Sequence, residues 1–231
     1  MKVTLLQYTP DPERTVALAA RLCYSSASIG ELHERFSQAD VTGFLEKIIS
    51  LGHQSVIEHI SFTFGIEGIS RACSHQLVRH RLASYSQQSQ RYVVFKGDDF
   101  PLIIPESISG STLRMASFTR AMAAAAEAYR ELVSDGVPAE DARFVLPNAA
   151  ETKIIVTMNG RELLHFFELR CCERAQWEIR AMALQMLKLT KPLAPTIFKS
   201  AGPGCISGPC PEGQFCCGRT TEIRNIYNSI E

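Results

Sequence analysis

Stretches with helical periodicity make up most of this chain, and only a few short segments with strand periodicity separate them. We expect strands at 2–8, 61–68 and 152–158, where apolar residues alternate with polar ones or β-branched residues accumulate. Apolar residues at helical spacing predict helices at 12–24, 40–52, 70–79, before Gly136, at 138–144 and from Arg161 to Pro192. A few strands separated by runs of helices predict an α+β fold rather than a repeating βαβ sheet.

Polar side chains mark where several of these helices should begin. Asp11, Asp40 and Ser70 each precede a helical stretch, and Pro12 follows the first of them. Such side chains can accept a hydrogen bond from a free N–H group in the first helical turn, so we expect all three to cap helices.

Composition excludes several classes of protein. Hydrophobic residues make up 45% of the 231 residues, which is enough for a folded core. Lys and Arg together number 24, as do Asp and Glu, so a protein that coats nucleic acid is not expected. The sequence has no secretion signal and no apolar stretch of about 20 residues. We therefore expect a cytoplasmic protein that binds no membrane and keeps its eight cysteines reduced.

The C-terminal segment differs from the rest of the chain in composition. We expect a folded domain over residues 1–200 and a tail over 201–231 that is rich in Gly, Pro and Cys. The tail thiols, Cys205, Cys210, Cys216 and Cys217, lack the paired Cys-x2-Cys spacing typical of a zinc site. A zinc site, a redox site and ordinary free thiols all remain open interpretations.

The densest chemical signal runs from Gln76 to Tyr92. Arg79, Arg81 and Arg91 lie there among hydroxyl and amide side chains, at the end of the helix that Ser70 opens. Residues 84–91 have no periodic apolar residue, so we expect a polar loop. Arginine binds phosphate groups through two parallel hydrogen bonds, which favours an anionic ligand. A solvated helix end and a non-catalytic RNA-binding module are the alternatives.

Two further clusters lie elsewhere in the sequence. Arg161 with His165, and Arg170 with Arg174, are each one helical turn apart, so each pair can share a helix face. Arg143 adds another cation before an apolar segment. These groups fit an anionic ligand, although ion pairs are an alternative; the candidate partners are Glu168, Glu173 and Glu178.

The segment 52–59 contains His53, Glu58 and His59 between a helix and a strand. One close pair of ligands is weak support for a metal, so we expect no metal there; hydrogen bonding to a bound ligand and an ordinary hydrogen-bonded loop are the favoured interpretations. The sequence also lacks a P-loop and a Rossmann fingerprint, so any nucleotide must be held in another way.

The arrangement Arg79-His80-Arg81, seven residues, then Ser89 resembles the signature of the flavin-dependent thymidylate synthases. Further segments are similar to that family in the same order: Gly52-His53, Glu58-His59-Ile60 with Phe62-Thr63-Phe64, Ala142-Arg143 with Leu146-Pro147, Asn159-x-Arg161, and Ala175-Gln176-Trp177-Glu178. Together they extend over about residues 3 to 198.

The resemblance implies the reductive methylation of dUMP to dTMP. Methylenetetrahydrofolate would supply the carbon, FAD reduced by NADPH would supply the hydride, and tetrahydrofolate would be released. It also implies a central, mostly antiparallel sheet wrapped by helices, and a homotetramer whose active sites combine residues of several subunits. The cofactor itself carries the redox chemistry in such enzymes, so the protein chiefly positions and polarises.

Residue roles follow from the same resemblance. Arg170 would be catalytic, favouring loss of the uracil N–H proton and stabilising the resulting charge. The implied substrate-binding residues are Gln76, Arg79, Gln87, Ser89, Gln90, Arg91, Arg143 and Arg170. The implied cofactor-binding residues are His53, Ser55, Arg79, His80, Arg81, Gln87, Asn159, Arg161 and His165, with His53 towards the folate or nicotinamide side.

The sequence departs from the family pattern at a few positions. Gln87 stands where many relatives have Glu, and His165 where Asn is frequent. Arg174 replaces a frequent His, and Cys171-Cys172 replaces more polar residues. A thiol or metal sensor centred on the tail is a further alternative, but it would leave the arginine clusters without a role.

Overall fold

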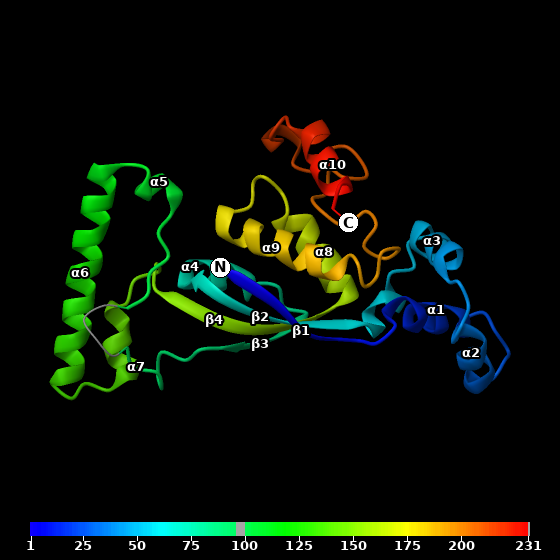
Figure 1. The fold of residues 1–231 in the computed structure, drawn as a ribbon, viewed down its shortest axis with the longest axis horizontal. Coiled ribbons are helices and arrows are strands. Elements are labelled where there is room, and N and C mark those ends of the chain that lie inside the picture. The colour runs from blue at the N-terminus through cyan, green and yellow to red at the C-terminus, as the bar shows by residue number, and fades with distance from the viewer. Residues whose placement is uncertain (96–99, 231) are drawn as a thin grey trace. The chain divides into compact units, whose positions relative to one another are not determined.

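The computed structural model describes residues 1–95 and 100–230 (Figure 1). Within them, four strands form one sheet in the order β1-β2-β4-β3. The strands are β1 (Lys2–Tyr8), β2 (Ser61–Ser70), β3 (Ala83–Gln87) and β4 (Glu151–Asn159). The combination of this antiparallel sheet with separate helices confirms the predicted α+β class.

Contacts along the sheet show that neighbouring strands run in opposite directions. The start of β1 lies beside Gly68 in the second half of β2, whereas Thr9, just after β1, exchanges hydrogen bonds with Ser61 at the start of β2. The Thr63 and Thr157 hydroxyls are 2.9 Å apart, which sets the register of β2 against β4. Such cross-strand pairs stabilise an antiparallel sheet.

The chain divides into two compact units, and each strand contributes residues to both. The first unit comprises residues 1–2, 66–79 and 85–155, and the second comprises 3–65, 80–84 and 156–231, of which residue 231 lies outside the described part. The first unit contains α4 (Arg71–Leu77), α5 (Glu106–Ser109), α6 (Thr112–Ser134), α7 (Ala139–Ala142) and the 3-10 turn η2 (Arg143–Val145).

Aromatic packing organises the core of the first unit. Phe100 is buried with Ala126 and Ala150, and its ring lies 5.6 Å from that of Phe95. Tyr129, from the predicted stripe on the long alanine-rich helix α6, packs edge-on against Phe95 at 6.1 Å. The stripe therefore holds α6 to this core, as its helical spacing predicted.

The second unit contains the remaining helices. They are α1 (Pro12–Leu22), α2 (Ile29–Phe36), α3 (Thr42–Ser50), α8 (Gly160–Arg170), α9 (Trp177–Thr190) and α10 (Thr220–Asn228), with 3-10 turns η1 (Ser55–His59) and η3 (Gly213–Phe215). Phe198 packs edge-on against Phe62 at 5.7 Å and against Phe167 at 6.0 Å, joining β2, α8 and the chain beyond α9. The predicted apolar stripe of α9 is fully buried: Ile179, Met182, Ala183, Met186 and Leu187.

The last helix is tied to the end of α8. The Tyr227 hydroxyl on α10 donates to the carbonyl of Cys171, the residue directly after α8, at 3.0 Å. Arg224, also on α10, donates to the carbonyls of Cys205 and Gly208. The C-terminal segment is therefore integrated into the second unit by buried and half-buried hydrogen bonds.

Three sequence predictions about local structure were wrong. The supposed loop at 84–91 contains strand β3, because backbone pairing with β4 continues to the Gln88–Lys153 bond and does not depend on apolar side chains. Asp11 has φ 43°, and within the described residues its carboxylate makes no capping hydrogen bond. Helix α4 ends at Leu77, so Arg79 lies beyond it.

Other predictions about helix ends were closer. Ser70 caps α4 by accepting from the Cys73 N–H at 3.0 Å. Asp40 accepts from the Thr42 N–H at 3.0 Å, although α3 begins only at Thr42, two residues after the start of the predicted range. Helix α1 ends at Leu22, two residues before the predicted end.

Candidate functional site

A hydrogen-bonded chain of three side chains lies within the second unit. The imidazole Nδ1 of His80 is 3.2 Å from Oε1 of Glu162, and the imidazole Nε2 accepts from Nε of Arg170 at 2.9 Å. Glu162 and Arg170 both belong to α8, whereas His80 precedes β3. The structure therefore brings two predicted site residues, His80 and Arg170, into direct contact.

The environment of His80 keeps its ring neutral. The residue is only 5% exposed, and the Phe166 ring lies edge-on at 4.9 Å. Burial and the charges of Arg170 and His165 lower the pKa of His80 to about 4. Burial raises the pKa of the Glu162 carboxyl, against the opposing effect of His165. A neutral imidazole can donate through one nitrogen and accept through the other.

Local sequence explains why α8 begins where it does. The Asn159 side chain accepts from the N–H of Glu162 at 2.8 Å and thus caps the helix. Gly160 follows, where an added Cβ would lie 2.8–2.9 Å from atoms of Ile57. The close approach of this turn to η1 therefore requires glycine.

A cavity of about 470 Å³ opens beside this helix start. Three predicted flavin-binding residues, Asn159, Arg161 and His165, line it together with Glu58 and Glu162. Nη1 of Arg161 forms an ion pair with Glu58 at 2.5 Å. The predicted sharing of one helix face by Arg161 and His165 is confirmed, because both line the same cavity.

The corresponding prediction for Arg170 and Arg174 was wrong. Helix α8 ends at Arg170, so Arg174 lies in the following turn and donates to the carbonyl of Phe215 at 2.6 Å. The helix ends just before Cys171-Cys172, and nothing in the apolar periodicity of the sequence there indicates a helix end.

Polar side chains of the first unit form a second arrangement around Gln87. Its amide nitrogen donates to the hydroxyl of Ser74 at 2.9 Å and to that of Thr152 at 3.2 Å. These bonds connect β3 to α4 and β4, and they fix the orientation of the amide. The neighbouring predicted residues, Ser89 and Gln90, are half-buried, and the Ser89 hydroxyl accepts from the backbone N–H of Arg91 at 3.1 Å.

Glu140 brings two of the predicted substrate-binding arginines to one place. Its carboxylate accepts from Nε of Arg91 at 2.8 Å, and its backbone carbonyl accepts from Nε of Arg143 at 3.1 Å. Burial, and after it the charge of Arg143, lowers the pKa of the Arg71 guanidinium. Arg91 and Arg143 therefore both contact Glu140, and Arg71 interacts electrostatically with Arg143, an arrangement that favours a ligand of opposite charge.

Sequence reasoning missed Arg71, Glu140 and Glu162. The position of Arg71 directly after a helix-capping serine was a usable signal, as was the Asn159-x-x-Glu162 spacing of a capped helix start. No local pattern marked Glu140, whose contact with Arg91 joins residues 49 positions apart.

Other predicted residues are placed singly. Gln76 is half-buried on α4, and Arg79 and Arg81 are exposed on either side of His80. Ser55 lies exposed at the start of η1, and the exposed His53 ring is 6.3 Å from that of Tyr24. These residues remain predicted ligand contacts.

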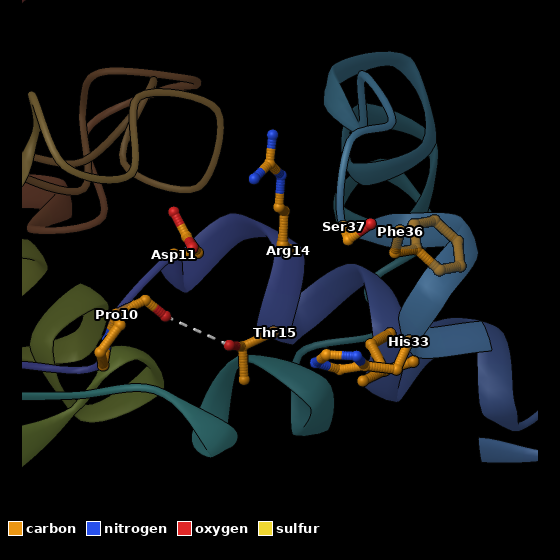
Figure 2. A pocket seen from close by; sticks show the side chains of 8 residues that line it. Pro10, Asp11, Arg14, Thr15, His33, Phe36 and Ser37 are labelled. Carbon is orange, nitrogen blue, oxygen red and sulfur yellow. Dashed lines mark hydrogen bonds between the residues drawn. The ribbon is translucent and has the colours of Figure 1, made fainter. Parts of the chain in front are cut away.

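A separate cavity of about 320 Å³ lies between α1 and α2, and it contains none of the predicted site residues (Figure 2). The carbonyl of Pro10 accepts from the Thr15 hydroxyl at its wall, at 3.5 Å (Figure 2). Asp11, which directly precedes α1, and Arg14 of α1 line it on one side, and His33 lines it from α2.

Residues 1–95 and 100–230 contain no group of three or more His, Cys, Asp and Glu side chains arranged to hold a metal. In the same part of the chain the cysteines are free thiols, and no helix has the length and apolar character needed to span a bilayer.

Comparison with known proteins gives these features a family. The family model described as thymidylate synthase complementing protein matches residues 4–196. The chain is 69% identical over 230 residues to the flavin-dependent thymidylate synthase of Geobacter sulfurreducens, covering 100% of this chain and 99% of that protein. It is 49% identical over 243 residues to the protein of the same name from Clostridium tetani, covering 98% and 97%.

A further relative, the flavin-dependent thymidylate synthase of Pyrococcus furiosus, is 49% identical over 219 residues, covering 92% of this chain and 90% of that protein. The chain therefore belongs to the flavin-dependent thymidylate synthase family, which confirms the resemblance drawn from its motifs.

Proposed function

We propose that this protein converts dUMP to dTMP by reductive methylation. In this proposal 5,10-methylenetetrahydrofolate donates the carbon, NADPH reduces bound FAD, and tetrahydrofolate is released. Family membership supports the thymidylate synthase reaction and the flavin. The observation that supports a catalytic role for Arg170 is its 2.9 Å hydrogen bond to the neutral imidazole of His80.

In the proposed mechanism, Arg170 acts on the pyrimidine ring of dUMP. A guanidinium remains charged at all physiological pH values. The hydrogen bond to His80 is made by Nε of Arg170, which leaves the Nη groups for the substrate in this proposal. The Nη donors would bind the uracil and stabilise the negative charge left when the ring N–H proton is removed. That charge makes carbon 5 more nucleophilic towards the methylene carbon.

The residues around the α8 cavity fit a flavin nucleotide. Asn159, Arg161 and His165 offer amide, guanidinium and imidazole donors on one wall, which suits the pyrophosphate of FAD. FAD, when bound, supplies the hydride that reduces the methylene to a methyl group. We propose that FAD is also contacted by the remaining predicted cofactor-binding residues, namely His53, Ser55, Arg79, His80, Arg81 and Gln87.

The substrate phosphate would be bound in the first unit. Arg91 and Arg143 meet at Glu140, and a phosphate dianion would replace the carboxylate as the acceptor for Arg91. Gln76, Arg79, Gln87, Ser89 and Gln90 complete the proposed nucleotide contacts. We further propose a homotetramer in which different subunits supply parts of each site.

A turnover assay tests the reaction. Purified protein is incubated with dUMP, methylenetetrahydrofolate, FAD and NADPH, and each component is omitted in turn while dTMP and the folate product are quantified. We expect dTMP only in the complete mixture, with tetrahydrofolate as the product. Formation of dTMP without flavin or reductant, or release of dihydrofolate, would contradict the proposal.

A further inference from the structure

We propose that Glu162 is a positioning residue that fixes the tautomer of His80 and thereby the orientation of Arg170. This inference rests on the proposed catalytic role of Arg170, but its geometric part can be tested without turnover. The observation that carries it is the continuous path Glu162–His80–Arg170, with separations of 3.2 Å and 2.9 Å.

The direction of each hydrogen bond follows from the chemistry of its donor. Arginine has only donors, so the bond from Nε of Arg170 requires a lone pair on Nε2 of His80. A neutral imidazole with an unprotonated Nε2 carries its hydrogen on Nδ1. That hydrogen needs an acceptor, and Oε1 of Glu162 lies 3.2 Å away. Both the ionised and the protonated carboxyl group offer an acceptor oxygen.

Burial makes this arrangement specific. His80 and Glu162 are each 5% exposed, so solvent is a poor substitute for either partner. Removal of the carboxyl group would take away the acceptor oxygen that lies 3.2 Å from the buried Nδ1 of His80, and losing a buried hydrogen bond is costly. The ring would then favour the tautomer with hydrogen on Nε2, and this hydrogen would point at the Nε–H of Arg170. Two donors would face each other, and Arg170 would have to move.

The charged groups around His80 favour the same state. Arg170 donates to the ring and Phe166 packs edge-on against it, and burial together with the charges of Arg170 and His165 lowers the pKa of His80. A cationic His80 would also lose its acceptor for Arg170. The three-residue chain therefore requires a neutral His80 together with an acceptor at position 162.

Nitrogen-15 NMR of the histidine side chains, at pH 7 and without substrate, tests the tautomer directly. The His80 signals are assigned by their loss in His80→Gln. In the unsubstituted protein we expect a protonated Nδ1 and an unprotonated Nε2. An Nε2–H tautomer or a cationic ring at pH 7 would overturn the inference, and this measurement needs no variant at position 162.

Two substitutions separate positioning from packing. Glu162→Gln keeps an acceptor oxygen and should preserve the Nδ1–H tautomer, whereas Glu162→Leu has no acceptor and should lose it. Glu127→Leu, an exposed residue of α6, is the control and should leave the His80 signals unchanged. An unchanged tautomer in folded Glu162→Leu would contradict the positioning role.

Kinetics then connect position to catalysis. We expect Glu162→Leu to lower kcat by about 10-fold to 100-fold, by analogy with the loss found when the partner that orients a metal-ligating histidine is removed. Glu162→Gln should stay within about threefold. If Arg170→Ala retains full turnover while the tautomers behave as described, the proposed role of Arg170 fails and the geometric inference stands. If Glu162→Leu keeps full kcat with a changed tautomer, the positioning role in catalysis is wrong.

Discussion

Both Nε and Nη2 of Arg91 lie 2.8 Å from the same carboxylate oxygen of Glu140. The two side chains are about half exposed, at 50% and 48%, so the pair adds little to stability. Its importance lies in occupying the guanidinium that we assign to the substrate phosphate.

Replacing Glu140 should therefore strengthen nucleotide binding. Glu140→Gln removes a competing negative charge, and we expect the Kd for dUMP to fall by about threefold, since an exposed pair is worth ~0.2–1 kcal/mol. Isothermal titration calorimetry measures this Kd, with Glu131→Gln on exposed α6 as the control. Weaker binding by Glu140→Gln would show that the carboxylate itself supports the site.

Arg71 should contribute to the same anion site. Its guanidinium is partly buried and repelled by Arg143, a cost that a bound phosphate would relieve. We expect Arg71→Gln to weaken dUMP binding by about 10-fold to 100-fold, corresponding to a hydrogen bond with a charged group. Comparing the Kd values for dUMP and for deoxyuridine, which lacks the phosphate, shows whether the lost contact is to the phosphate. Equal loss for both ligands would contradict a phosphate contact, and Arg120→Gln on α6 serves as the control.

The free energy of unfolding should depend on the protonation of His80. The folded-state pKa of about 4 lies below the ordinary value of 6.5, so the unfolded chain binds the proton first as the pH falls. Stability contributed by the neutral ring is therefore present above pH 6.5 and lost between pH 6.5 and about 4. The full loss would be about 3 kcal/mol, at 1.36 kcal/mol per pKa unit.

Urea unfolding from pH 7.5 to 4 measures this dependence. The raised pKa of Glu162 contributes with the opposite sign, because its stability is present at low pH and is lost as the pH rises. His80→Gln isolates the imidazole, and the difference between the two curves should shrink as the pH falls. Parallel curves would show that His80 titrates normally.

The cysteines should differ widely in reactivity. The thiolate is the reactive form, and burial raises the pKa of Cys171 to about 12. The N–H of Gly218, 3.4 Å from Sγ, and the Cys210 thiol lower the pKa of the half-buried Cys216. Iodoacetamide at pH 7 with peptide mass spectrometry should label Cys216 and leave Cys171 unmodified until the chain is unfolded. Exposed Cys23 is the reference, and early labelling of Cys171 would contradict its burial in solution.

The shared-site proposal predicts complementation between inactive variants. Arg79→Ala and Arg170→Ala should each have little activity, because each lacks one component of the proposed site. If different subunits supply these residues, mixed tetramers contain some intact sites and should recover part of the activity. Subunit exchange is verified by native mass spectrometry. Exchange without recovery would place both residues in the same subunit's site.

Local patterns predicted most of the fold. Alternation at residues 61–68 and the apolar stripe of α9 depend on burial of one face, and both are present in the structure. Strand β3 was missed because an edge strand can be held by backbone hydrogen bonds while its side chains remain polar. Helix α2 was missed although Ser28 and Glu31 form a complete capping box, which is a recognisable signal.

The candidate site was predictable only in part. Family motifs identified His80 and Arg170, but motif spacing cannot show that residues 90 positions apart share a hydrogen bond. The Asn159-x-x-Glu162 spacing marks a helix start, but only tertiary packing brings the Glu162 carboxyl to His80 and the Glu140 carboxyl to Arg91. The prediction that Arg170 and Arg174 share a helix face failed because the helix ends between them.

The buried bond from Tyr227 to the carbonyl of Cys171 braces the residue next to Arg170 from the other end of the sequence. For protein engineering, α10 is therefore part of the support for the proposed catalytic residue. Deleting α10 or fusing another protein to it would disturb the backbone beside Arg170, as a substitution at Cys171 would.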